Sequence, residues 1–307
     1  MTELELYKKY RPVKLTELVG QKNATNMLVR MVNDGNIPRC LLFTGPSGTG
    51  KTSAARILRT RVDCSEHDFV EINAADTRGI DTVREIKQKM NMAPMGGESR
   101  VWLIDEFHAM TSQAQQATLK ILEDTPKHVY FFLATTDPNK LLKTILTRST
   151  EIRFKSLSIA DLEELLKKVC SLEKVLLPED VLDKVVICSD GSARKALVLL
   201  HQIYKLPSEA EQLEALEKAS SQQNASRLFQ ALLGRENWSE VAKILKELDD
   251  EPEMIRRYIL AACSNILLGN KKNAAKAYSL IVAFESPFHD SGKAGLIRAC
   301  WEVIREN

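Results

Sequence analysis

A glycine-rich run places the strongest constraint on how this chain can fold. The run reads Gly45-Pro46-Ser47-Gly48-Thr49-Gly50-Lys51-Thr52 and matches the pattern G-x-x-x-x-G-K-[ST]. It follows an apolar segment with strand character and opens a segment with helical spacing. In that context, backbone N–H groups and a helix N-terminus converge on phosphate oxygens. The sequence therefore predicts a phosphate-binding loop between a strand and a helix.

The first half of the chain alternates short β-rich runs with amphipathic runs, which is typical of a parallel α/β sheet. The expected strands are 40–43, 69–73, 101–104, 129–134 and 151–154. The expected helices between them are 52–62, 81–90 and 112–123. Trp102-Leu103-Ile104 and Tyr130-Phe131-Phe132-Leu133 are continuous apolar runs, so these two segments are expected to be central strands covered on both faces.

Beyond residue 154 the pattern is helical. Ser158, followed three residues later by Asp161, predicts a capped helix start, Pro178 predicts the first turn of a second helix, and a third begins near Ser192. We expect three parts: an α/β P-loop domain over 1–155, a small helical domain over 156–206, and an all-α helical bundle over 207–307.

Composition excludes several classes of protein. The 307 residues carry a net charge of +2, so a nucleic-acid surface must be local. No run approaches about 20 apolar residues, and the start of the chain lacks the apolar core of a secretory signal. The six cysteines are scattered, which predicts buried thiols in a reducing compartment. The expected location is the cytoplasm.

The chemistry expected at the loop is that of ATP with Mg²⁺. Lys51 would reach the β- and γ-phosphates, and the Thr52 hydroxyl would ligate the metal. The apolar strand 101–104 ends in Asp105 and Glu106. Asp105 would hold the metal and Glu106 would activate the attacking water, so hydrolysis is favoured over simple binding. The expected phosphate-side contacts are Gly45, Pro46, Ser47, Gly48, Thr49, Gly50, Lys51, Thr52 and Ser53.

The order of several further motifs resembles the clamp-loader branch of AAA+ ATPases, namely replication factor C small subunits and the bacterial DNA polymerase III gamma/tau subunit. The motifs run from the N-terminus to about residue 200. They are Tyr10-Arg11-Pro12, Leu18-Val19-Gly20-Gln21, Asp105-Glu106-Phe107-His108, Leu133-Ala134-Thr135-Thr136-Asp137, Thr147-Arg148-Ser149 and Gly191-Ser192-Ala193-Arg194.

The resemblance implies that residues 1–155 form an AAA+ ATPase domain, 156–206 a helical lid and 207–307 a collar or oligomerisation domain. It also implies a role for each of the motifs. Arg11, Pro12 and Val19 would border the adenine. Thr136, with Thr135 close behind, would sit beside the γ-phosphate, and Arg194 would contact ATP from the lid. Arg148 would reach the ATP of the neighbouring subunit, where a delocalised cation neutralises developing charge. Asn73 would restrain Glu106 until DNA is bound.

The resemblance also implies partners. These are a sliding clamp, other loader subunits in a pentameric assembly, and primer–template DNA bound without sequence preference. Arg78, Arg84 and Lys87 would contact phosphates together with the helix N-terminus at Thr111, and Gln116 is a hypothetical link from DNA to the ATP site. The segment Cys64-Ser65-Glu66-His67-Asp68 leaves no room for the four-cysteine zinc insertion of gamma/tau subunits, which favours a compact loader subunit such as that of a phage. The location implied is the cytoplasm of a bacterial or phage-infected cell, or the nucleus if the source is eukaryotic.

Three alternatives remain open. The chain could be an AAA+ recombination or branch-migration motor, although we find no segment resembling a winged helix. It could be a non-hydrolysing scaffold subunit of a loader, against which the intact Lys51, Thr52, Asp105 and Glu106 argue. A small-molecule P-loop kinase is less favoured because the helical last third would have no task.

Overall fold

The computed structural model describes residues 4–77, 79–234, 237–248, 250–269, 273–288 and 291–305. The chain divides into two compact units, unit 1 over Met1–Lys205 and unit 2 over Leu206–Asn307. Unit 1 contains both the α/β part and the three helices after it. The finer boundary expected between residues 155 and 156 stays a prediction.

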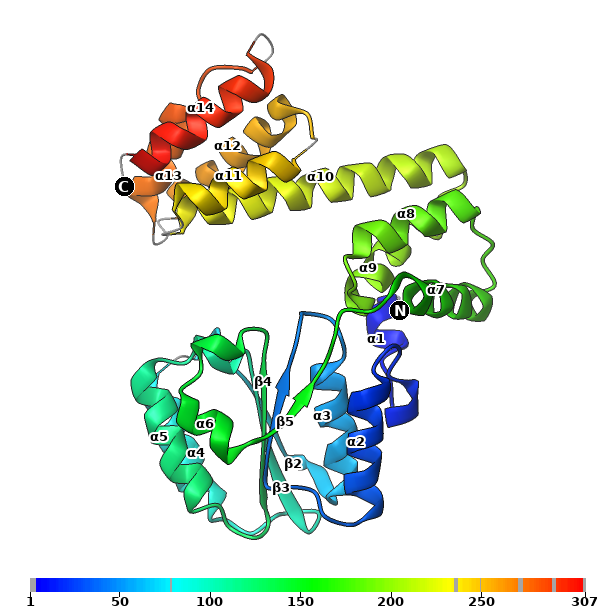
Figure 1. Ribbon diagram of the computed structural model, residues 1–307, viewed down its shortest axis with the longest axis vertical. Helices are drawn as coiled ribbons and strands as arrows, with labels where there is room; N and C mark the ends of the chain where they lie inside the picture. Colours follow the sequence, from blue (N-terminus) through cyan, green and yellow to red (C-terminus); the bar gives the residue numbers. More distant parts are fainter. Residues whose placement is uncertain are drawn as a thin grey trace. The chain divides into compact units, whose positions relative to one another are not determined.

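A five-stranded parallel sheet forms the centre of unit 1 (Figure 1). Its strands are β1 (Cys40–Thr44), β2 (Cys64–Asn73), β3 (Ser99–Asp105), β4 (Val129–Thr135) and β5 (Thr150–Arg153). Their order is β2-β3-β4-β1-β5, and every neighbouring pair is parallel. The carboxyl ends of β1, β3 and β4 therefore meet at one edge, where α/β sheets bind ligands.

Helices cover both faces of the sheet (Figure 1). The helical elements up to β5 are α1 (Leu6–Lys9), η1 (Leu15–Glu17), α2 (Lys22–Asn33), α3 (Lys51–Arg61), α4 (Ile80–Met90), η2 (Phe107–Ala109), α5 (Ser112–Glu123), η3 (Pro138–Lys140) and α6 (Lys143–Arg148). Alternate strand residues point to opposite faces. Leu41 and Phe43 pack with α2 and α3, while Leu42 and Trp102 pack with α4, α5 and α6.

The expected sheet and its helices are confirmed, with small shifts at the ends. The strand expected at 69–73 begins at Cys64, and β5 ends at Arg153, one residue before Phe154. Residues 112–123 form α5 as expected, whereas α3 and α4 each begin one residue early. The central strands are buried because helices cover both faces, which agrees with their continuous apolar runs.

Three helices complete unit 1, namely α7 (Ile159–Glu173), α8 (Glu179–Ser189) and α9 (Ala193–Ile203). Ser158 caps α7 in a reciprocal capping box with Asp161, as the sequence predicts. Pro178 is the N-cap of α8 rather than a residue of its first turn, because its ψ of 150° is extended. Ser192 caps α9. We call these three helices the lid.

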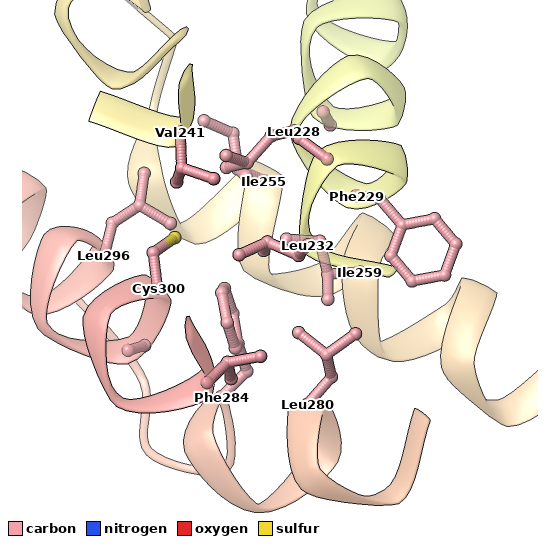
Figure 2. Close-up of a cluster of buried hydrophobic side chains, with 14 of the residues drawn as sticks. Leu228, Phe229, Leu232, Val241, Ile255, Ile259, Leu280, Phe284, Leu296 and Cys300 are labelled. Atoms are coloured by element: carbon pink, nitrogen blue, oxygen red, sulfur yellow. The ribbon is translucent and has the colours of Figure 1, made fainter. Parts of the chain in front are cut away.

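Unit 2 is entirely helical in the part that the structure describes. Its helices are α10 (Glu209–Leu233), α11 (Trp238–Glu247), α12 (Pro252–Leu268), α13 (Ala274–Ala283) and α14 (Gly292–Arg305). Leu228, Leu232, Ile259 and Phe284 point into a common apolar core (Figure 2). Trp301 of α14 differs from these core residues, because 45% of it remains exposed.

The prediction of buried thiols is confirmed for five of the six cysteines. All six thiols are free, five are buried, and Cys188 is half-buried. Burial raises the pKa of the Cys300 thiol to about 12, so it stays protonated at neutral pH. Among the helices that the structure describes, none is long and apolar enough to cross a membrane.

Candidate nucleotide site

The loop between β1 and α3 has the backbone shape of a phosphate cradle. Gly45 has φ of +137° and Gly48 has φ of +74°, values that side chains with a Cβ rarely adopt. A Cβ at Gly45 would overlap the carbonyl oxygen of Phe154, and one at Gly48 would overlap the Ser192 hydroxyl. The first backbone N–H groups of α3 have no acceptor within the helix, so they are available to an anion.

Lys51 and Thr52 stand at the start of α3, directly behind this loop. The Lys51 ammonium donates to the carbonyl oxygens of Gly45 at 2.6 Å and Pro46 at 2.8 Å. Burial lowers the pKa of Lys51, and the nearby carboxylates of Glu106 and Asp105 partly offset that effect. A buried cation beside backbone N–H groups suits a polyphosphate.

The donor set for a magnesium ion is assembled from two elements. The Thr52 hydroxyl on α3 donates to Oδ2 of Asp105, the last residue of β3, at 2.9 Å. Hydroxyl and carboxylate oxygens are the ligands that Mg²⁺ prefers, and the ion usually takes the rest from phosphates and water. Thr52 and Asp105 therefore fit the metal of a Mg²⁺–ATP complex.

Glu106 follows Asp105 in the left-handed conformation, with φ of +49°. The Thr136 hydroxyl donates to its Oε2 at 3.1 Å. Because β3 and β4 are parallel neighbours, Thr136, directly after β4, reaches the residue directly after β3. The sheet edge thus brings together Thr136 and Glu106, two predicted site residues that lie 30 positions apart.

The other side of the pocket is built from the N-terminal segment and the lid. Arg11, Pro12 and Val19 line it together with Arg194 of α9. The Arg194 backbone N–H donates to the Gly48 carbonyl at 3.3 Å, which ties the lid to the phosphate loop. Burial, with the neighbouring cations Arg56 and Arg194, lowers the pKa of Arg11. The pocket is therefore rich in positive charge where an anion would bind.

Several lining residues have no distinguishing mark in the sequence. They are Tyr7, Leu165, Lys168, Val169 and Leu172. Tyr10, which belongs to the motif Tyr10-Arg11-Pro12, lines the pocket as well. Those on α7 read as parts of an ordinary amphipathic helix, and only the packing of the lid brings them to the pocket. Apart from Lys168 these side chains are apolar or aromatic, which suits the face of a base.

Two predicted roles look different in the structure. Asn73 does not bond to Glu106: within the described residues its amide donates to Asp76 at 2.8 Å and its Oδ1 accepts from the Ala75 N–H at 3.0 Å. This local turn occupies the side chain, so restraint of Glu106 by Asn73 is absent here. Likewise Gln116 is exposed, and it is the buried Gln115 that bonds to the carbonyl oxygens of Met110 and Lys140.

Arg148 lies outside the pocket of its own chain. It ends α6, is half-exposed, and pairs with Glu123 at 2.6 Å. Arg84 and Lys87 are exposed on α4, and Arg84 pairs with Asp81 at 2.7 Å. The Thr111 hydroxyl caps α5 by accepting from the Ala114 N–H. Arg78 lies outside the described residues.

Comparison with known proteins gives relatives for most of the chain. Residues 65–158 match the family described as DNA polymerase III, delta subunit. The DNA polymerase III subunit gamma/tau of Mycobacterium tuberculosis is 34% identical over 223 residues, covering 65% of this chain and 39% of that protein. Subunit tau of Bacillus subtilis is 32% identical over 273 residues, covering 81% and 48%. The resemblance to AAA+ clamp-loader subunits is confirmed. The chain spans less than half the length of these relatives.

Solved structures agree on the fold. The Thermotoga maritima RuvB Holliday junction branch migration motor superposes with a TM-score of 0.58 at 19% identity, covering 77% of this chain and 85% of that one. A proline-to-glycine mutant of the same RuvB gives 0.59, also at 19% identity, over 82% and 91%. At such identity the likeness shows the AAA+ fold alone.

Proposed function

We propose that this chain is an ATP-hydrolysing subunit of a clamp loader, which opens a DNA sliding clamp and places it at primer–template junctions during replication. The carrying observation is that Lys51, Thr52, Asp105 and Glu106 meet in one pocket. The similarity to gamma/tau subunits supports the loader assignment.

Each of these pocket residues has a separate role in ATP hydrolysis. Bound Mg²⁺–ATP supplies the phosphoanhydride bond and the divalent charge. Lys51 holds the β- and γ-phosphates. Arg194 adds a positive charge from the lid, so the position of the lid becomes sensitive to the bound nucleotide. Glu106 orients a water molecule and accepts its proton, while Thr136 holds the carboxylate.

Arg148 is proposed to act on the neighbouring subunit's nucleotide. Its position outside its own pocket supports this, because a half-exposed guanidinium at a helix end can enter another chain's site. Arg148→Ala should reduce the ATPase rate of the assembled complex by at least about tenfold and leave ATP affinity within about twofold. Arg153→Ala, another exposed arginine, is the control. Unchanged turnover in Arg148→Ala would remove the assignment.

DNA is proposed to contact α4 and the N-terminus of α5. Arg84 and Lys87 are exposed on α4, whose other face packs on the sheet through Val83 and Ile86. Phosphate contacts position a duplex without reading its sequence. Arg84→Ala with Lys87→Ala should weaken binding equally to unrelated sequences and flatten its salt dependence by about two charges. A loss confined to one sequence would contradict this.

Two exposed apolar surfaces suit protein partners. Met92 and Met95 stand on the loop after α4, 57% and 82% exposed, and flexible thioethers suit a clamp surface. On unit 2, Tyr278 and Val282 lie one turn apart on α13 and are exposed, which supports the proposed collar contacts of a pentamer. Met92→Ser with Met95→Ser should abolish clamp stimulation, whereas Tyr278→Ser should shift the assembly to smaller mass.

The first experiment is the steady-state ATPase rate of the protein alone, then with primed DNA, a sliding clamp and accessory loader subunits. Stimulation by clamp and primed DNA together, lost in Glu106→Gln although ATP still binds, is the expected result. Stimulation by branched DNA alone would instead identify a branch-migration motor. Full loading activity in Glu106→Gln would identify a scaffold.

A further inference from the structure

His108 lies between the end of β4 and the carboxylate of Glu106. Its Nδ1 is 3.3 Å from Oε2 of Glu106 and 3.1 Å from Oγ1 of Thr135. The imidazole belongs to the short η2 turn directly after Glu106, and its side chain is 20% exposed. It therefore faces the edge of the sheet where the proposed chemistry takes place.

The two oxygens of Glu106 have different surroundings. Oε2 accepts from the Thr136 hydroxyl and faces His108 Nδ1. Among the described residues, none donates a hydrogen bond to Oε1, and Glu106 lines the nucleotide pocket. The backbone is held as well, because the Glu106 N–H donates to Oδ1 of Asp105 at 2.9 Å. One carboxylate oxygen is thus anchored, while the other has no described partner.

The support under His108 is rigid. Thr135 is fully buried in β4, and its Oγ1 also accepts from the Asp137 N–H at 3.1 Å. Phe107, the residue before His108, is fully buried among the side chains that pack α4 and α5 on the sheet. An imidazole fixed in this way can hold a neighbouring carboxylate without moving with it.

We propose that His108 is a positioning residue for Glu106, with a hydrogen on Nδ1 that is shared between Thr135 Oγ1 at 3.1 Å and Oε2 of Glu106 at 3.3 Å. This rests on the proposed function, in which Glu106 activates the attacking water. Two donors, His108 and Thr136, fix the carboxylate plane, so that Oε1 can take the water's proton. Such orientation matters because a misplacement of about 1 Å can cost about a hundredfold in rate.

The same geometry replaces the expected role of Asn73. Asn73 lies at the end of β2 and is engaged with Asp76, so the described contacts reach Glu106 from the β4 side. The orientation of Glu106 is consequently coupled to the strand that ends in Thr135 and to Thr136 directly after it.

The test uses His108→Ala, which removes the donor, and His108→Asn, whose side-chain amide nitrogen can replace Nδ1. We expect His108→Ala to lower kcat for ATP roughly tenfold, with KM and measured ATP affinity within about twofold of wild type. His108→Asn should recover most of that rate. His67→Ala, an exposed histidine on β2, is the control and should match wild type.

Several results would overturn the proposal. An unchanged or increased kcat in His108→Ala would show that His108 does not position the base. Equal losses in the Ala and Asn variants, or a loss of ATP affinity and thermal stability, would show a structural role only. The Glu106→Gln variant distinguishes a failure of this inference from a failure of the proposed function. If Glu106→Gln is inactive and His108→Ala is normal, only this inference fails, whereas equal ATPase rates in wild type and Glu106→Gln would overturn the proposed function and this inference with it.

Discussion

Asp68 and Arg100 form a buried ion pair between β2 and β3, under the loop that carries Met92 and Met95. Their side chains are 2.9 Å apart, and they are 0% and 9% exposed. Oδ2 of Asp68 also accepts from the backbone N–H groups of Met95 and Gly96 at 2.9 and 3.0 Å. Replacing Asp68 by Ala leaves the buried positive charge of Arg100 without its partner carboxylate. The same change removes the hydrogen bonds that hold the loop at Met95 and Gly96.

The expected cost follows from this burial. Removing one partner of a buried ion pair destabilises a protein by about 3–5 kcal/mol, since the remaining charge has no water to solvate it. For a unit of this length that corresponds to a fall in Tm of about 10 °C. Asp68→Leu with Arg100→Met should cost less, because it leaves no charge behind.

The tryptophans allow the two units to be followed separately. Trp102 is buried in β3 of unit 1, whereas Trp238 and Trp301 belong to unit 2. In a background with Trp238→Phe and Trp301→Phe, emission during heating reports unit 1 alone. Glu66→Ala removes the exposed partner of Arg59 and is the control, with an expected change within about 0.5 kcal/mol.

The pH dependence gives an independent measure of the same pair. Burial alone would raise the pKa of Asp68, but hydrogen bonds from Arg100, Ser65 and the loop outweigh it and lower the pKa to about 2, against an ordinary 3.8. The stabilisation, about 2 kcal/mol, is present above pH 3.8 and is lost as the pH falls through 2. Asp68→Ala should lack this loss. A Tm shift under about 2 °C, or a paired replacement as costly as the single one, would refute the reasoning.

Three further predictions concern single positions. Gly45→Ala should abolish ATP binding and lower the Tm of unit 1, since the new methyl group meets the Phe154 carbonyl; full binding would contradict this. Ser158→Ala should destabilise unit 1 by about 1 kcal/mol in urea unfolding through loss of the α7 cap, and Ser158→Thr, which keeps the hydroxyl that bonds to Asp161, should not. Glu253→Gln should destabilise unit 2 by about 2 kcal/mol, because the Arg256 guanidinium holds the pKa of this carboxyl at about 2; tryptophan emission of unit 2 measures it, and unchanged unfolding would exclude the effect.

Much of the nucleotide site follows from local sequence. The phosphate loop needs Gly45 and Gly48 for left-handed backbone, and Lys51 and Thr52 for the first turn of a helix, so spacing along the chain is enough to identify it. The acidic pair at the end of β3 can be predicted for the same reason, since an apolar strand that ends in two carboxylates is a local pattern.

Contacts that depend on how the strands and turns pack could not be predicted from local sequence patterns. His108 lies near Glu106 in the sequence, and Asn73 lies near it in strand order. No local pattern distinguishes which of the two side chains faces Glu106. The choice depends on the turn that occupies Asn73 and on the register of β4, which places Thr135 under the imidazole.

By itself, the sequence determined the periodicity of the strands and helices, the positions of the caps and the identity of the phosphate loop, because each depends on residues within about one turn or one strand of each other. The tertiary structure alone decided which oxygen of Glu106 is held, which lid side chains line the pocket and which glutamine joins α5 to the segments that follow β3 and β4. Those outcomes depend on packing between elements. A shift of one residue in strand register, or a rotation of a helix by a quarter turn, changes which side chain faces the site.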